Sequence, residues 1–203
     1  MAIAAGADAV GLVARMPSGP GCISDRLISE IAETIPPGVD SFLLTSETDP
    51  RLVVEHVLKC RASVVQLVGE TSRETYVTLR KECPGVRIVQ VVHVEDQSAI
   101  GQAQRASERV DAILLDSGRP NAEVPELGGT GREHDWSVSK EIVEGLAIPV
   151  FLAGGLNPEN VGKAIKQVSP FGVDLCSGVR TNGVLDRTLL ESFVKSVRDV
   201  DCQ

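Results

Sequence analysis

Short runs rich in Val, Ile and Leu recur along the chain, and each is followed by a polar turn and a segment with helical periodicity. The runs are continuous and do not alternate between apolar and polar residues, which is typical of strands covered on both faces of a parallel sheet. We therefore predict seven strands, over residues 9–13, 41–45, 64–68, 87–92, 110–115, 149–153 and 172–176. The predicted helices cover residues 25–35, 50–60, 73–82, 97–108, 136–145, 158–168 and 187–198.

Two of these helices have a sequence signal for their first turn. Asp49-Pro50 and Asn157-Pro158 each place a capping side chain before a proline. Proline suits the first helical position because its missing N–H would have no intrahelical partner there. We therefore expect Asp49 and Asn157 to cap the two helices.

Alternating strands and helices of this length predict a parallel sheet surrounded by helices. No Gly-x-Gly-x-x-Gly follows the first strand, so a (β/α)8 barrel (TIM barrel) is favoured over a doubly wound sheet. We predict one such domain over residues 1–203, of the type that binds phosphate.

The predicted barrel is one unit short of eight. The chain opens on Ala2 to Ala5, an alanine-rich helical tail that ends at Gly6, so we interpret the first strand of the barrel as missing from this chain. Unpaired edges would then be exposed on strands 9–13 and 172–176. Three explanations stay open: the natural chain starts earlier, another chain of a homo-oligomer covers the gap, or the edges are protected in another way.

The composition excludes several classes of partner. A net charge of −8 over 203 residues gives no reason to expect nucleic acid or an anionic membrane. No stretch approaches the roughly 18–20 apolar residues that span a bilayer, and the start lacks the features of a signal peptide. Five scattered cysteines without a CxxC pair fit reduced thiols in a cytoplasmic protein. The three histidines are not at metal-ligand spacing from one another, so we predict no metal.

Two glycine-containing turns follow the last two predicted strands. In barrels of this class, catalytic residues lie at the C-terminal ends of the strands, and the last two loops hold phosphate. Gly154 and Gly155 follow strand 149–153, and Ser177 and Gly178 follow strand 172–176. Glycine lets the backbone approach a ligand closely, and N–H groups at a helix start bind anions without Lys or Arg. The turns predict a phosphorylated small-molecule substrate; two tight turns that merely need glycine are the alternative.

Other strand ends carry side chains that suit proton transfer or hydrogen bonding. Strand 110–115 delivers Asp116 to its end, and a long polar loop follows. An acid beside a loop with exposed N–H groups can donate a proton to a small ligand; a solvated Asp in a turn is the alternative. Further candidates on the substrate side are Gln66, His93, Gly129, Gly131 and Asp174.

Several segments resemble the phosphoribosylanthranilate isomerase family. The combination of L-L-D-S at 114–117, G-G-T-G at 128–131 and D-W at 135–136 is fairly specific, whereas the glycine turns are shared with other phosphate-binding barrels. The similarity covers the whole chain, because residues 4–11 match the end of the family's first helix and its second strand. Further matching segments are Val64–Leu67, Ala153–Val161, Gly172–Asp174 and Ser177–Val179.

The resemblance implies an enzyme with a (β/α)8 barrel that catalyses the Amadori rearrangement of N-(5-phosphoribosyl)anthranilate in tryptophan biosynthesis, without a metal or an organic cofactor. It implies that Asp116 is the general acid that protonates the ribose ring oxygen. It also implies a phosphate site formed by Gly154, Gly155, Ser177 and Gly178.

Three features of the family's pattern are absent. The family's general base, a cysteine in a K-x-C-G motif on the first strand, does not occur here, and His93 or Cys176 as its replacement is a hypothesis. Gly21 stands where the family has an arginine for the anthranilate carboxylate, and Val68 replaces the histidine of Q-L-H-G. Two other functions therefore stay open: a divergent barrel isomerase for another phosphorylated sugar, and a non-catalytic protein that binds a phosphorylated ligand.

Overall fold

The computed structural model describes residues 1–16, 21–118 and 133–201. Its main sheet is formed by strands β1 (Ala9–Val13), β2 (Asp40–Thr45), β3 (Val64–Leu67), β4 (Arg87–His93), β5 (Ala112–Asp116), β6 (Val150–Leu152) and β7 (Gly172–Val173). The helices are α1 (Ala2–Ala5), α2 (Asp25–Thr34), α3 (Pro50–Cys60), α4 (Arg73–Glu82), α5 (Ser98–Ser107), α6 (Trp136–Gly145), α7 (Val161–Val168) and α8 (Arg187–Asp201), with a 3-10 turn η1 (Ser177–Val179). A hairpin of β8 (Arg180–Thr181) and β9 (Val184–Leu185) precedes α8.

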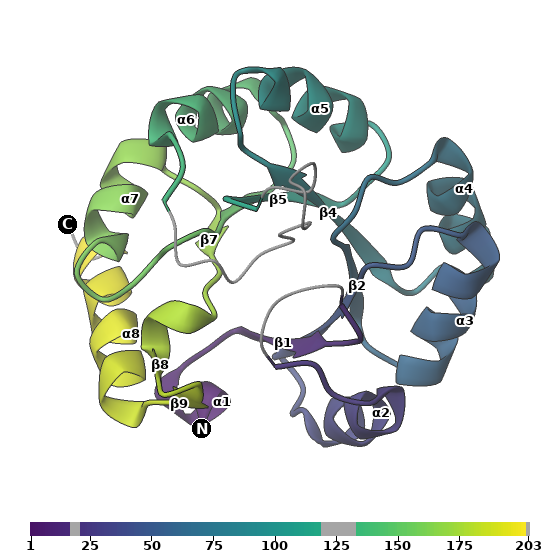
Figure 1. The fold of residues 1–203 in the computed structure, drawn as a ribbon, viewed down its shortest axis with the longest axis horizontal. Helices are drawn as coiled ribbons and strands as arrows, with labels where there is room; N and C mark the ends of the chain where they lie inside the picture. Colours follow the sequence, from purple (N-terminus) through teal and green to yellow (C-terminus); the bar gives the residue numbers. More distant parts are fainter. Residues whose placement is uncertain (17–20, 119–132, 202–203) are drawn as a thin grey trace.

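The seven strands of the main sheet lie in chain order, and every neighbouring pair is parallel. Figure 1 shows the strands curling around the centre of the molecule with the helices outside them. This arrangement places all the C-terminal ends of the strands on one side of the molecule. The side chains that the sequence places at the strand ends therefore share one face of the fold.

Alternate residues of the strands enter two separate apolar clusters. The larger cluster contains Leu43, Val65 and Ile113 together with the buried faces of the helices, so it fills the layer between sheet and helices. The smaller one consists of the strand residues that face away from the helices: Val64, Val68, Val89, Val91, Ala112, Leu114 and Ala153. Two faces that are both covered explain why the strands read as continuous apolar runs.

One of the two predicted helix caps is confirmed and the other is wrong. The Asp49 side chain accepts the N–H groups of Arg51 and Leu52 at the start of α3. At the second site the helix α7 begins three residues later than predicted, after Asn160. The Asn157 side chain instead accepts the N–H groups of Glu159 and Asn160, at 2.9 and 3.0 Å, and so closes a turn that precedes the helix.

The edges of the main sheet are β1 and β7, each of which has one strand partner within the described residues. Strand β7 ends at Val173 and not at residue 176 as predicted. Its partner β6 has only three residues, so β7 finds few residues to pair with. The chain then enters η1 at Ser177, shortly after β7. The hairpin β8–β9 was not predicted from the sequence. Within the described residues, no helix is long and apolar enough to cross a membrane.

Candidate active site

Four of the predicted site residues lie on the same face at the C-terminal ends of their strands. Gln66 alternates with the inner residues Val64 and Val68 on and just after β3, and Asp116 continues the inner series of β5. The Cα of His93 at the end of β4 pairs in register with that of Asp116. Asp174 follows Gly172 by two residues, and Gly172 packs against the inner ring of Phe151. The fold thus brings the four residues Gln66, His93, Asp116 and Asp174 to one mouth.

Asp116 has the environment that a general acid requires. The residue is partly buried at the end of β5, and its Oδ1 accepts the backbone N–H of Ser117 at 2.7 Å. Burial raises the pKa of Asp116 above its ordinary value, and the hydrogen bond from Ser117 opposes this shift. A carboxyl with a raised pKa keeps its proton to a higher pH, so it can donate that proton in the mouth.

Asp174 is a second carboxyl with a perturbed titration. The loss of surrounding water and, to a smaller extent, the charge of Asp116 together raise the pKa of Asp174 to about 6. The residue as a whole is nevertheless exposed, so solvent screening weakens the energetic consequence of this shift. Two carboxyls that disfavour each other's ionisation are a recurrent feature of proton-transfer sites.

We expect Asp174→Asn to raise the melting temperature at pH 8 and to leave it unchanged near pH 4. A carboxyl whose pKa is raised in the folded state favours folding most below its ordinary pKa, and this contribution is lost as the pH rises through about 6. Because Asp174 is exposed and therefore screened by water, we expect a gain of only about 1 kcal/mol, or about 2–4 °C. Thermal unfolding at both pH values measures the difference, with Asp199→Asn on the surface of α8 as the control. A wild-type chain that is more stable than Asp174→Asn at pH 8 would contradict this expectation.

The side chains of His93 and Gln66 are held by burial, and that of His93 also by a hydrogen bond, which the sequence alone did not indicate. The Nε2 of His93 lies 3.1 Å from the carbonyl oxygen of Val68, and its Nδ1 is buried without a hydrogen-bond partner among the described residues. Burial lowers the pKa of His93, so the ring is neutral at pH 7 and cannot act as an acid. The neutral ring donates Nε2–H to Val68 and keeps a lone pair on Nδ1. Gln66 is buried in the inner wall of the sheet.

The two glycine turns that were predicted to bind phosphate are in direct contact. A Cβ on Gly178 would lie 2.0 Å from the carbonyl oxygen of Leu156, so only glycine fits at this crossing of the two loops. Gly154 and Gly155 have φ angles of 84° and 68°, a region that favours glycine. Within the described residues, the backbone N–H groups of Gly154 and Gly155 donate no hydrogen bond. The turns therefore form one surface with N–H groups available to an anion.

The glycine turn after β6 also touches the turn that follows Asp116. A Cβ on Gly154 would lie 2.8 Å from Oγ and 2.9 Å from the backbone nitrogen of Ser117. Ser117 is therefore a functional candidate that the sequence had not singled out, because its contact with Gly154 depends on how the two strands lie side by side. This contact places the carboxyl of Asp116 next to the predicted phosphate loops.

Three other candidates are less informative. Cys176 is a half-buried free thiol just before η1. Gly129 and Gly131 lie outside the described residues. A cavity of about 660 Å³ lies between α4 and the end of α5, and a second of about 460 Å³ extends from these helices to the segments that follow β3 and β4, where His93 borders it. Their linings mix acidic and basic side chains, and we assign them no function.

The profile of a family described as N-(5'-phosphoribosyl)anthranilate isomerase matches residues 17–196. The chain belongs to this family. It is 37% identical to the N-(5'-phosphoribosyl)anthranilate isomerase of Methanocella arvoryzae over 194 residues, which cover 95% of this chain and 89% of that protein. It is 35% identical to isomerase 2 of Methanosarcina mazei, with coverage of 98% and 88%. The resemblance noted in the sequence is thereby confirmed.

Solved structures of phosphoribosylanthranilate isomerases share the fold. The enzyme of Thermotoga maritima superposes with a TM-score of 0.81 at 31% identity, over 98% of this chain and 91% of that one. Another structure, with a TM-score of 0.78 and 29% identity over 98% and 91%, is a complex of the isomerase with reduced 1-(o-carboxyphenylamino)-1-deoxyribulose 5-phosphate. The predicted (β/α)8 barrel class is confirmed, and the described part of the chain supplies seven of its strands.

Two departures from the phosphoribosylanthranilate isomerase pattern have distinct structural settings. Val68 is buried with the inner cluster, so an apolar side chain occupies a position where the sequence comparison expected a histidine. Gly21 is exposed, with a φ of 88°, and a Cβ there would meet no atom within 4 Å. The described residues leave space for a side chain at Gly21, but its positive φ favours glycine there.

Proposed function

We propose that this chain is a phosphoribosylanthranilate isomerase that converts N-(5'-phosphoribosyl)anthranilate into its ketose isomer, a step of tryptophan biosynthesis. Family membership supports the reaction. The observation that carries the proposal is the contact between Gly154 and Ser117, because it joins the glycine turns to the carboxyl of Asp116. A phosphorylated sugar held by the turns would place its reacting carbons beside the acid.

We assign the phosphate of the substrate to Gly154, Gly155, Ser177 and Gly178. The N–H groups of Gly154 and Gly155 have no acceptor within the described residues, so they are available to bind an anion. Ser177 begins η1, and the first N–H groups of a helix lack an intrahelical acceptor. Backbone donors suit a chain with a net charge of −8, since they attract phosphate locally without a surplus of Lys or Arg.

We assign the role of general acid to Asp116. The protonated carboxyl donates to the ribose ring oxygen, the C1–O bond breaks, and the nitrogen lone pair forms a C1=N bond. A base then removes the C2 proton, which gives an enol that tautomerises to the ketose. Both proton transfers require groups held near C1, C2 and the ring oxygen, and an anchored phosphate fixes those positions. Asp174, which lies close enough to Asp116 to respond to its charge, and Gln66 on β3 are the further side chains that we assign to the sugar.

The base in this scheme stays a proposal with two candidates inside the described chain. His93 is neutral and has a lone pair on Nδ1, and Cys176 is a free thiol beside the phosphate loop.

We also propose that residues 1–203 act as one domain and that the protein works in the cytoplasm. Association with a second copy at the edges β1 and β7 is a further proposal, supported by their single strand partners within the described residues.

The test is turnover of N-(5'-phosphoribosyl)anthranilate by the full chain, followed by chromatographic separation of the substrate from the ketose. We expect turnover, and we expect inorganic phosphate to inhibit it and to raise the melting temperature by binding the folded state. Chains with His93→Ala and Cys176→Ala identify the base, because unchanged turnover in both would exclude these two candidates.

Two outcomes would contradict the proposed reaction. Turnover of another phosphorylated sugar but not of this substrate would indicate a divergent isomerase. A phosphate-dependent rise in melting temperature without turnover of any phosphosugar would indicate a protein that only binds phosphorylated ligands.

A further inference from the structure

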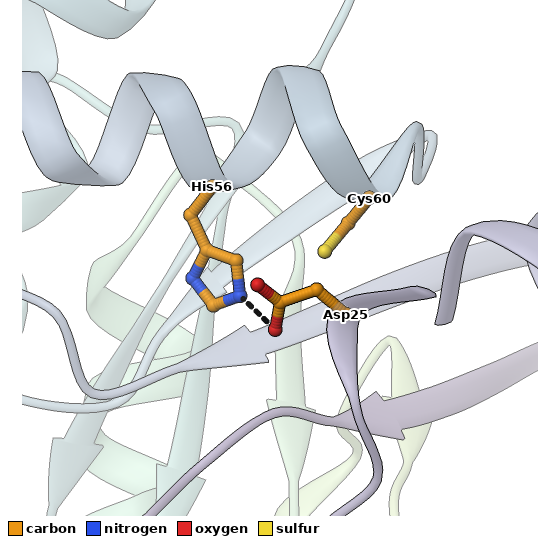
Figure 2. A group of neighbouring side chains, drawn as sticks. All are labelled: Asp25, His56 and Cys60. Carbon is orange, nitrogen blue, oxygen red and sulfur yellow. Dashed lines mark ion pairs between the residues drawn. The ribbon is translucent and has the colours of Figure 1, made fainter. Parts of the chain in front are cut away.

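A cluster of three potential metal ligands lies outside the mouth, where α2 packs against α3. Asp25 is the first residue of α2, and His56 and Cys60 are one turn apart on α3. Figure 2 shows the three side chains pointing toward one another across the gap between the two helices. One ligand atom from each residue lies within 4.8 Å of the other two.

The spacing of these atoms approaches that of a tetrahedral metal site. Metal–ligand bonds of 2.0–2.3 Å at tetrahedral angles place neighbouring ligand atoms roughly 3.5 Å apart. The Nε2 of His56 and the Oδ1 of Asp25 are 3.3 Å apart. The Sγ of Cys60 lies within 4.8 Å of both atoms, so a shift of about 1.3 Å at most would complete three corners.

The histidine is held in the orientation that metal binding requires. Its Nδ1 lies 3.0 Å from the Oγ1 of Thr45, a buried hydroxyl that also accepts the N–H of Glu47. When Nδ1–H donates to Thr45, the lone pair is on Nε2, as in sites where a second partner fixes the histidine tautomer. Within the described residues, Nε2 is buried without a hydrogen-bond partner, although a carboxylate oxygen lies 3.3 Å away. A cation between the two atoms would satisfy both.

We propose that Asp25, His56 and Cys60 bind a divalent metal ion of the Zn²⁺ class, with water as the fourth ligand. Sulfur, imidazole nitrogen and carboxylate oxygen together match Zn²⁺ better than Mg²⁺ or Ca²⁺, which take oxygen ligands. The site joins α2 to α3 and lies on the helix side of the sheet, so it stabilises the fold and leaves the reaction at the mouth unchanged. The sequence alone predicted no metal, because it compared histidines with one another and not His56 with Cys60.

Lys59 is the competing cation in this cluster. Its Nζ pairs with the Oδ2 of Asp25 at 2.8 Å, whereas Oδ1 faces His56. The two carboxylate oxygens therefore serve different partners, and a metal on Oδ1 does not require Lys59 to leave. Removing Lys59 is expected to preserve or strengthen metal binding.

The experiment uses the untagged full chain, stripped with a chelator and titrated with Co²⁺ and then Zn²⁺. We expect one ion per chain, a thiolate-to-Co²⁺ charge-transfer absorption that Zn²⁺ abolishes, and a Zn²⁺-dependent rise in melting temperature. Cys60→Ser should lose the absorption, and His56→Gln should weaken affinity about 100-fold or more, since even indirect partners of metal ligands contribute 10–100-fold. Cys83→Ser, which removes another buried free thiol, and Lys59→Gln should keep the absorption.

The proposal is overturned if the wild-type chain binds no Co²⁺ or gives no charge-transfer absorption. It is also overturned if Cys60→Ser keeps the absorption of the wild-type chain, because another thiol would then be the ligand. If Cys60→Ser does not fold, His56→Gln decides, since it leaves the thiol in place and should still weaken binding. Isomerase turnover is independent of these outcomes.

Discussion

Asp116→Asn is expected to lower kcat for N-(5'-phosphoribosyl)anthranilate by roughly 10²–10⁴-fold, the usual contribution of a general acid. The amide cannot release a proton to the ring oxygen, but its oxygen can still accept the N–H of Ser117, so the turn keeps its shape. KM should change little, because the phosphate contacts lie on the glycine turns. Steady-state kinetics separates the two parameters, with Asp199→Asn on the surface as the matched control.

The pH dependence of kcat/KM provides a second test of the role of Asp116. A general acid works only while protonated, so kcat/KM should fall as the pH rises through the pKa of Asp116, which burial raises above its ordinary value. This limb of the profile should vanish in Asp116→Asn. Burial disfavours the ionised carboxyl, so the Asn variant should unfold at the same temperature as the wild-type chain or a higher one. Retention of more than about a tenth of wild-type turnover would show that Asp116 is not the acid.

The strands were predictable because burial on both faces leaves a direct mark on the sequence. All four residues of β3, from Val64 to Leu67, are buried, and three of them are apolar, with Gln66 the one polar exception. The prediction was wrong where tertiary partners set the end of an element. Strand β7 stops early because β6 offers only a short ladder, and Asn157 caps a turn because its amide finds N–H groups before the helix begins.

The site was predictable only as far as strand ends define it. Asp116 and the glycine turns follow directly from the positions of their strands, since parallel strands bring their C-terminal ends together. The contact between Gly154 and Ser117 and the cluster of Asp25 with His56 join residues far apart in the chain. No local pattern encodes such distances, because they depend on how the strands and helices pack. The one local signal was the four-residue spacing of His56 and Cys60 on one helix face.

Gly178→Ala is expected to destabilise the fold and to weaken phosphate binding together. The added Cβ would lie 2.0 Å from the carbonyl oxygen of Leu156 and 3.1 Å from the Cα of Asn157, which are both backbone atoms. Leu156 is only 2% exposed, so its backbone cannot move away without disturbing the packed layer beneath it. We expect a loss of at least about 2 kcal/mol in the free energy of unfolding, or about 4–8 °C in melting temperature.

Two further variants separate the fold from the phosphate site. Gly145→Ala, at the end of α6, adds a Cβ with no atom within 4 Å, so it should leave the melting temperature unchanged or raise it. Ser177→Ala removes only a hydroxyl and should weaken phosphate binding about tenfold without loss of stability, as expected for a hydrogen bond to a charged group. If Gly178→Ala melts like the wild-type chain, the two turns are not packed against each other as described. If Ser177→Ala binds phosphate as tightly as the wild-type chain, that hydroxyl is not a phosphate ligand, and the anion is held by the backbone N–H groups of the turns alone.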